Sequence, residues 1–228
     1  ILPSEAARRF VRCAVLRTGQ WALDGRRMHT TLTDFRERLA TITVEMLVAI
    51  QSFATQADLT GAPALFNVDA SLLHEQPAFT QGPSVSLIVT SPPYPGVHML
   101  YHRWQVDGRK ETPAPYWIAG CDDGKGAAFY NFGDRRDSGA KQYFAASLST
   151  LHSIRRVMKA GAHMVQLIAF NRPEEQLPRY LSNMAEAGFD DLRGRTRIWR
   201  DVPNRRWHAS LVGRTHSARE VVLVHRAI

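Results

Sequence analysis

The chain has 228 residues, of which 44% are hydrophobic, and it carries a formal charge of +8. This length is enough for one core of ordinary size, and no apolar segment approaches the roughly 18 residues needed to cross a bilayer. Two cysteines, Cys13 and Cys121, cannot by themselves make a disulfide framework or a four-ligand zinc site, and no metal is expected. These features predict a soluble cytoplasmic protein with no membrane partner, and the charge favours a polyanionic one.

Two helices are predicted at the start of the chain. Ser4 is a suitable cap for a helix over 4–16, and apolar residues spaced by three or four predict a longer helix over 32–58. We assign residues 1–60 to a helical segment that packs on the rest of the chain or links to it. Because the sequence opens at Ile1 directly into a helical pattern, we expect a further segment upstream.

A sheet is predicted after residue 61. Two strand candidates lie over 64–69 and 85–89, and the second is a nearly continuous apolar run that suits a strand buried on both faces of a parallel sheet. The alternation continues with predicted helices over 143–159 and 177–187, and with predicted strands over 163–170, 195–200 and 220–225. This order predicts an α/β layered sheet that ends in an antiparallel pair of strands. Residues 61–228 would form this domain, with a long insertion over 95–142.

Ser91-Pro92-Pro93-Tyr94 follows the predicted strand over 85–89 at its carboxyl end, the edge where open α/β sheets bind ligands. Two consecutive prolines fix two φ angles and remove two N–H donors, so the nearby carbonyls are held as acceptors in a rigid loop. The Ser91 hydroxyl adds an acceptor, and the Tyr94 ring offers a flat surface for a base. Two acceptors that hold both hydrogens of a base amine would orient its nitrogen toward a methyl donor.

Thr90-Ser91-Pro92-Pro93-Tyr94 resembles the target-base motif of amino-methylating DNA methyltransferases, in which Asp, Asn or Ser precedes Pro-Pro and an aromatic residue. The resemblance covers residues 64–228. It implies a partial Rossmann-like class I methyltransferase fold, S-adenosyl-L-methionine (AdoMet) as cofactor, DNA as substrate and a restriction-modification setting. The serine version is most similar to the cytosine-N4 enzymes. The catalytic residues that it implies are Ser91, Pro92, Pro93 and Tyr94.

The cofactor site is the least complete part of this resemblance. Asp69 and Ala70 match the family's adenine-contacting segment and would bind AdoMet, although Asp69 is equally suited to cap a helix. The family's glycine-rich turn has no counterpart, because Gly124-Lys125-Gly126 follows no predicted strand and lacks the third glycine. We therefore expect the chain to bind AdoMet weakly unless an upstream segment supplies this turn.

Arginines are concentrated in the last part of the chain. Residues 193–226 contain nine arginines against two acids, with Trp199 and Trp207 among them. This composition favours contacts with phosphates and bases, although a solvated edge hairpin has the same composition. The nucleic-acid-binding candidates are Arg195, Arg197, Arg200, Arg205 and Arg206.

Three functions stay open at this point. The first is a site-specific DNA methyltransferase that acts on cytosine N4. The second keeps the chemistry but acts on adenine N6 or, with less support, on an RNA base, and the third is a nucleic-acid-binding remnant without catalysis. His98 and His102 have the spacing of metal ligands on a helix, but Pro95-Gly96 precedes them, so a metal site is not expected.

Overall fold

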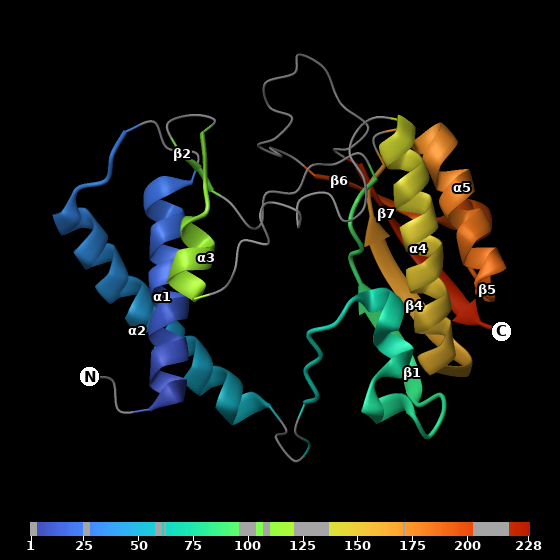
Figure 1. Cartoon of the computed structure of the whole chain (residues 1–228), viewed down its shortest axis with the longest axis horizontal. Coiled ribbons are helices and arrows are strands. Elements are labelled where there is room, and N and C mark those ends of the chain that lie inside the picture. The colour runs from blue at the N-terminus through green and yellow to red at the C-terminus, as the bar shows by residue number, and fades with distance from the viewer. Residues whose placement is uncertain are drawn as a thin grey trace. The chain divides into compact units, whose positions relative to one another are not determined.

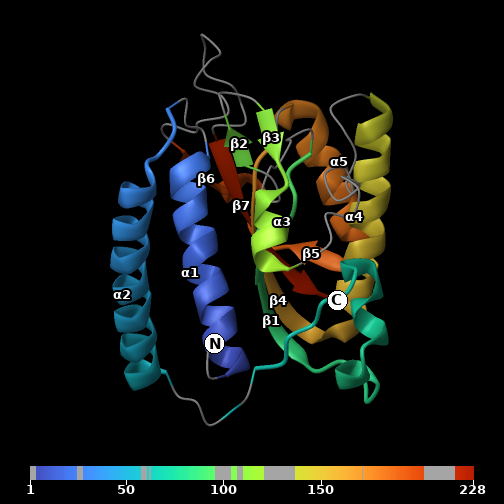
Figure 2. The ribbon, with the colours of Figure 1, turned by 60° about the vertical axis from the view of Figure 1, so that its left-hand side comes forward.

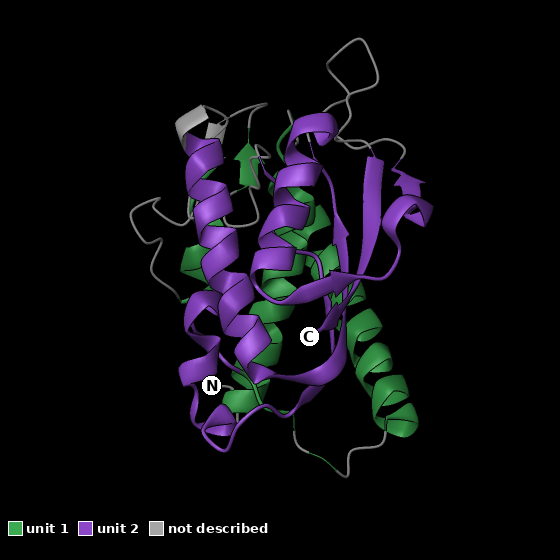
Figure 3. Ribbon diagram, turned by 90° about the vertical axis from the view of Figure 1, so that its right-hand side faces the viewer, with its two compact units in different colours: residues 1–65, 100–129 green, residues 66–99, 130–228 purple. Residues whose placement is uncertain are grey.

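The computed structural model describes residues 4–24, 28–57, 61, 63–95, 104–106, 110–120, 137–170, 172–202 and 219–228. The chain forms two compact units (Figure 3). The helical unit comprises Ile1–Leu65 and Leu100–Phe129, and the sheet unit comprises Phe66–Met99 and Tyr130–Ile228. Residues 100–129, which lie inside the expected insertion over 95–142, thus belong to the unit of the N-terminal helices.

The described residues of the helical unit form three helices and a short ribbon of two strands. Helix α1 (Glu5–Leu23) packs against both α2 (Leu32–Gln56) and α3 (Ala114–Ala119), as Figure 2 shows. Strands β2 (Trp104–Val106) and β3 (Lys110–Thr112) pair in antiparallel fashion. Both long helices begin where polar side chains cap them, since Ser4 Oγ accepts from the Ala7 N–H and Thr31 Oγ1 accepts from the Asp34 N–H.

Helix α1 ends seven residues later than the sequence predicts. Its predicted end at residue 16 is wrong, because the helix continues through Gly19 to Leu23. A Cβ atom at Gly19 would lie 2.9 Å from the Trp104 ring. Gly19 therefore serves the close approach of an aromatic ring to the helix and does not end the helix.

Helix α2 has 25 residues and is long and apolar enough to cross a membrane, with a mean hydropathy of 1.2 over an 18-residue window. The helix resembles a membrane-spanning helix in length and composition alone. The core helix of a soluble protein and a signal sequence have the same length and composition. Polar residues such as Glu45 interrupt the apolar run, so this property is not apparent from the length of any uninterrupted apolar segment. Ile42 is buried, whereas Val44, Leu47, Val48, Ile50 and Phe53 are exposed. The lack of a membrane partner stays a prediction.

The described residues of the sheet unit form a mixed sheet of five strands. Its order is β1 (Val85–Thr90), β4 (Met158–Ile168), β7 (Arg219–Ala227) and β5 (Phe189–Asp191), and β6 (Ile198–Asp201) also pairs with β7. Strand β1 is parallel to β4, whereas β7 is antiparallel to all three of its neighbours. The predicted α/β class is therefore confirmed, including the antiparallel pair formed by β6 and β7.

Two helices cover one face of this sheet and enclose the core. Helices α4 (Asp137–Val157) and α5 (Pro173–Glu186) lie side by side on the same face (Figure 1). Both begin earlier than predicted, and Pro173 occupies the first turn of α5, where a missing N–H costs little. The core between helices and sheet includes Tyr143, Phe144, Leu151, Met158, Met164, Ile168, Tyr180, Met184, Val221 and Leu223.

Strand β4 begins five residues before the predicted strand over 163–170, because α4 runs directly into it at Met158. The pairing with β1 then shifts, from Val85 opposite Met158 to Leu87 opposite His163. Gly161 lies in this irregular stretch with a φ of 77°. This left-handed backbone conformation, which glycine adopts readily, therefore belongs to the irregular part of β4.

The predicted strand over 64–69 is wrong. Residues 63–67 are irregular, and Leu65 is 91% exposed. A 3₁₀ turn, η1 (Ala70–Glu75), follows Asp69, and another, η2 (Pro77–Phe79), leads toward β1. The Asp69 carboxylate caps η1 by accepting from the Ser71 N–H at 2.9 Å, and this local hydrogen bond competes with strand formation.

Strand β1 lies at an edge of the sheet and is not buried on both faces as predicted. Ile88 packs against the core, but Leu87 and Val89 on the other face are 57% and 73% exposed. The apolar run misleads because burial depends on neighbours, and β4 is the single strand that pairs with β1 among the described residues.

Candidate functional site

The segment Ser91-Pro92-Pro93-Tyr94, called here the SPPY loop, directly follows the last residue of β1 at the carboxyl end of that strand. The predicted position of the motif at this edge of the sheet is thus confirmed. Ser91 and Pro93 are exposed, Pro92 is half-buried and Tyr94 is buried. The loop therefore combines an open side with an anchored end.

Tyr143 of α4 holds the loop from the core side. Its hydroxyl donates to the Pro93 carbonyl at 2.8 Å. Burial, with a further contribution from nearby Tyr180, raises the pKa of Tyr143 well above its usual value, so the phenol stays protonated and can donate. The Pro92 carbonyl receives no hydrogen bond from the described residues, and it remains an acceptor beside the Ser91 hydroxyl.

Tyr94 anchors the other end of the loop. Its side chain belongs to the hydrophobic core and is 9% exposed. The hydroxyl donates to Glu220 Oε1 at 2.9 Å and lies 3.3 Å from Ser91 Oγ. The ring thus packs mainly against protein, and the stacking of a base on Tyr94 stays a prediction.

Glu220 is a functional candidate that the sequence analysis does not identify. It is the second residue of β7, it is 1% exposed, and it lies opposite Arg200 of β6. Arg200 donates to Glu220 Oε2 from Nε at 3.1 Å and from Nη2 at 2.5 Å. The signal that was available is an acid at the start of an otherwise apolar predicted strand, because buried acids need a partner.

The two candidate cofactor residues lie at an exposed turn. Asp69 and Ala70 are both exposed, and Asp69 Oδ1 accepts from the Ser71 hydroxyl as well as from its N–H. These two hydrogen bonds lower the pKa of Asp69, which holds the carboxylate ionised in its capping role. The helix-cap interpretation of Asp69 is therefore realised, and its role toward AdoMet stays a prediction.

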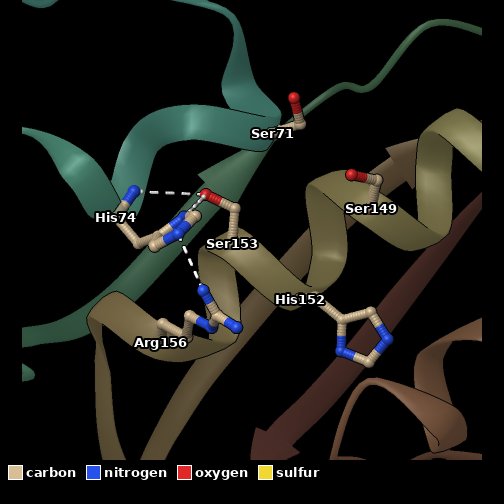
Figure 4. A pocket seen from close by; sticks show the side chains of 6 residues that line it. All are labelled: Ser71, His74, Ser149, His152, Ser153 and Arg156. Atoms are coloured by element: carbon tan, nitrogen blue, oxygen red, sulfur yellow. Dashed lines mark hydrogen bonds between the residues drawn. The ribbon is translucent and has the colours of Figure 1, made fainter.

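The turn η1 that Asp69 begins is fastened to α4. His74 Nδ1 lies 2.9 Å from Ser153 Oγ, and Arg156 Nη1 lies 2.8 Å from His74 Nε2 (Figure 4). These α4 residues belong to its last turns, and the chain then continues to Met158, which pairs with Val85. The contacts of η1 therefore lie at the end of the sheet where β1 begins, whereas the SPPY loop follows the opposite end.

A shallow polar pocket of about 330 Å³ lies between η1 and α4. Figure 4 shows that Arg156 points toward His74, whereas His152 points away from both. The polar groups at its centre are already bonded to one another, so they attach η1 to the helix. The residues that line this pocket are Ser71, His74, Ser149, His152, Ser153 and Arg156.

The predicted nucleic-acid-binding arginines have different environments. Arg197 forms an ion pair with Asp191 and its side chain is 17% exposed, whereas Arg200 pairs with Glu220 and stays 59% exposed. Arg195 is exposed and forms no ion pair with any described residue. Arg205 and Arg206 lie outside the described residues. Contacts of these arginines with nucleic acid stay a prediction.

The described part of the chain contains no group of three or more His, Cys, Asp or Glu side chains that could hold a metal ion. His98 and His102 lie outside the described residues, as does Gly124-Lys125-Gly126.

No protein-family model matches the chain, and no curated protein sequence matches it. Three crystal structures of one protein from Thermus thermophilus, provisionally assigned as a DNA modification methylase, resemble it in shape. The TM-score is 0.38 for each, with 16% identity to the selenomethionine derivative and 18% identity to the other two. One of those two holds S-adenosyl-L-methionine. The aligned region covers 70% of this chain and 50–53% of the other protein, so this chain spans about half its length.

Proposed function

We propose that the chain is part of an AdoMet-dependent DNA methyltransferase that methylates an exocyclic base amine, with cytosine N4 as the target atom. The observation that carries this proposal is the SPPY loop at the carboxyl end of β1, where Ser91 is exposed and the Tyr143 hydroxyl holds the Pro93 carbonyl.

The acceptors suit the chemistry of a base amine. The nitrogen lone pair of such an amine is delocalised into the ring, so the nitrogen is a poor nucleophile until it becomes pyramidal. Ser91 Oγ and the Pro92 carbonyl oxygen could each accept one of the two amine hydrogens. Two prolines restrict the loop, and the Tyr143 and Tyr94 hydroxyl bonds fix its position, so the acceptors are held in place before a base arrives.

The cofactor would supply an activated methyl group. Among the described residues, Asp69 and Ala70 are the candidates for holding it, but Asp69 Oδ1 is already bonded to Ser71 and the sequence has no glycine-rich turn. The described residues therefore do not make a complete AdoMet site. The proposal assigns to this chain the recognition of the target amine.

The test is nucleoside mass spectrometry on DNA from cells that express the complete protein. We expect N4-methylcytosine from the wild type and none from Ser91→Ala, because the variant lacks one of the two acceptors. Ser86→Ala is the matched control, since Ser86 is an exposed serine of β1, the strand that precedes Ser91, and its replacement should leave methylation unchanged.

N6-methyladenine instead of N4-methylcytosine would contradict the target atom but leave the role of the SPPY loop intact. The same modification in RNA alone would contradict DNA as the substrate. A folded wild-type protein that modifies no nucleoside would contradict the proposed function as a whole.

A further inference from the structure

A continuous chain of polar side chains connects the exposed Ser91 to a buried ion pair. Ser91 Oγ lies 3.3 Å from the Tyr94 hydroxyl, which lies 2.9 Å from Glu220 Oε1. The other carboxylate oxygen of Glu220 binds Arg200 through two nitrogens, at 3.1 Å and 2.5 Å. These side-chain hydrogen bonds therefore connect the SPPY loop to β7 and then to β6.

The charges at one end fix the direction of the hydrogen bonds. Arg200 carries donors alone, and Glu220, paired with it, is a carboxylate that accepts alone. The single hydrogen of the Tyr94 phenol is therefore given to Glu220. Since the phenol has no second hydrogen, the hydroxyl of Ser91 is the donor in the contact between Ser91 and Tyr94.

A serine hydroxyl has one hydrogen and two lone pairs, so it can either donate to a base amine or accept from it. Once its hydrogen points toward Tyr94, the lone pairs of Ser91 face the remaining directions. A base amine presents hydrogens, so it can donate to Ser91 when the Ser91 hydrogen points toward Tyr94. When the Ser91 hydrogen points toward the amine instead, two donors face each other and no hydrogen bond forms.

We propose that Glu220, held by Arg200, is a positioning residue that makes Ser91 a hydrogen-bond acceptor for the target amine. This inference rests on the proposed function and deepens it. An aspartate at this position would be an acceptor because of its charge. The neutral serine becomes an acceptor because its hydrogen bond to Tyr94 uses its only hydroxyl hydrogen. The role also accounts for a carboxylate that is 1% exposed beside the buried Val221, a location that is costly unless the charge has a partner.

Glu220→Gln tests the direction of these hydrogen bonds with little change in the shape of the side chain. The glutamine amide can donate to the Tyr94 oxygen, and the phenol can then donate to Ser91, which turns the Ser91 hydrogen outward. We expect kcat for methylation to fall about tenfold, the size of one lost hydrogen bond, while KM for DNA changes little. Asp190→Asn is the matched control, because Asp190 also pairs with an arginine of β7, Arg226, but lies on the surface.

A double-mutant cycle with Tyr94→Phe separates this role from general damage to the sheet. Tyr94→Phe removes the hydroxyl that links Glu220 to Ser91, so adding Glu220→Gln to it should lower kcat no further. Circular dichroism reports whether each variant folds. If Glu220→Gln does not fold, a Tyr94→Phe protein with wild-type kcat contradicts the inference by itself.

Two results would overturn the positioning role while methylation by the wild type stands. One is a folded Glu220→Gln protein with wild-type kcat, and the other is an additive effect of the two substitutions. Failure of the wild type to methylate any base is a different result, and it contradicts the proposed function from which this inference starts.

Discussion

At the residue scale, His225 shows how one buried side chain makes the sheet unit sensitive to acid. It lies in β7 with 1% of its surface exposed, and neither ring nitrogen has a hydrogen-bond partner among the described residues. Burial lowers the pKa of His225, and the positive charge of Arg197 lowers it further, against the opposing effect of Asp191. The imidazole is therefore held neutral in the folded protein.

This depressed pKa predicts lower stability in mild acid. The unfolded chain binds a proton near pH 6.5, whereas the folded chain binds it at lower pH, so the stabilising effect is complete above pH 6.5 and is lost as the pH falls through the folded pKa. The loss amounts to about 1.4 kcal/mol for each pH unit that separates the two values.

Urea unfolding between pH 7.5 and 5 measures the effect. Stability should fall across this range in the wild type and fall less in His225→Leu, which cannot titrate. His163→Gln, at an exposed histidine of β4, should keep the wild-type dependence. Equal slopes for His225→Leu and the wild type would show that this histidine is not the group responsible.

Elements with a strong local pattern are those that the sequence predicts. The capped start of α1, the start of α2 at Leu32, the alternation of helices and strands after residue 85 and the pairing of β6 with β7 are all confirmed. Errors occur where a distant contact overrides a local signal, as at Gly19, which Trp104 covers. The three-residue strand β5 is not predicted, because its pairing with β7 gives no period that so short a segment could reveal.

In the candidate site, too, the sequence predicts the local feature but not the contacts between distant residues. The SPPY loop is visible in the sequence because its four residues are consecutive and follow an apolar strand. Its anchors are not visible, since Tyr143 lies 50 positions from Pro93 and Glu220 lies 126 positions from Tyr94. Periodicity within a helix or strand carries no information about such pairs, which the fold alone brings together.

Gly161 provides a prediction at the scale of the element. Its φ of 77° is rarely adopted by residues with a Cβ atom, although a Cβ at this position would meet no atom within 4 Å. Gly161→Ala should therefore destabilise the protein by about 1 kcal/mol through backbone strain and not through a clash.

Thermal unfolding of Gly161→Ala beside Gly61→Ala checks this prediction. Gly61 also has open space around it but does not have a φ in the left-handed region, so its replacement should be neutral or slightly stabilising. Equal melting temperatures for the two variants would contradict the argument from backbone conformation.

At the scale of the whole molecule, the positive residues behind the charge of +8 are not equally available to bind a polyanion. Several arginines of the sheet unit are neutralised by carboxylates, including Arg197 by Asp191 and Arg226 by Asp190. Arg195 forms no such pair among the described residues. Its charge is therefore available for a phosphate in the proposed interaction with DNA.

The salt dependence of DNA binding distinguishes these arginines. If Arg195 contacts one phosphate, Arg195→Ala should reduce the slope of log affinity against log salt concentration by about 0.9. Arg226→Ala removes an arginine that is also exposed but is paired with Asp190, and it should leave the slope unchanged. Fluorescence anisotropy with duplex DNA over a series of KCl concentrations gives both slopes, and an unchanged slope for Arg195→Ala would place that side chain away from the DNA.

Strand β7 also has a consequence for the order of assembly during protein synthesis. It pairs with β4, β5 and β6, and all three leave the ribosome before it does. Tyr94 is synthesised 126 residues before the glutamate that binds its hydroxyl. A nascent chain therefore carries the SPPY motif through a long period of translation without the partner that orients it. The hydrogen bond between Tyr94 and Glu220 can therefore form only after β7 has been synthesised and has entered the sheet.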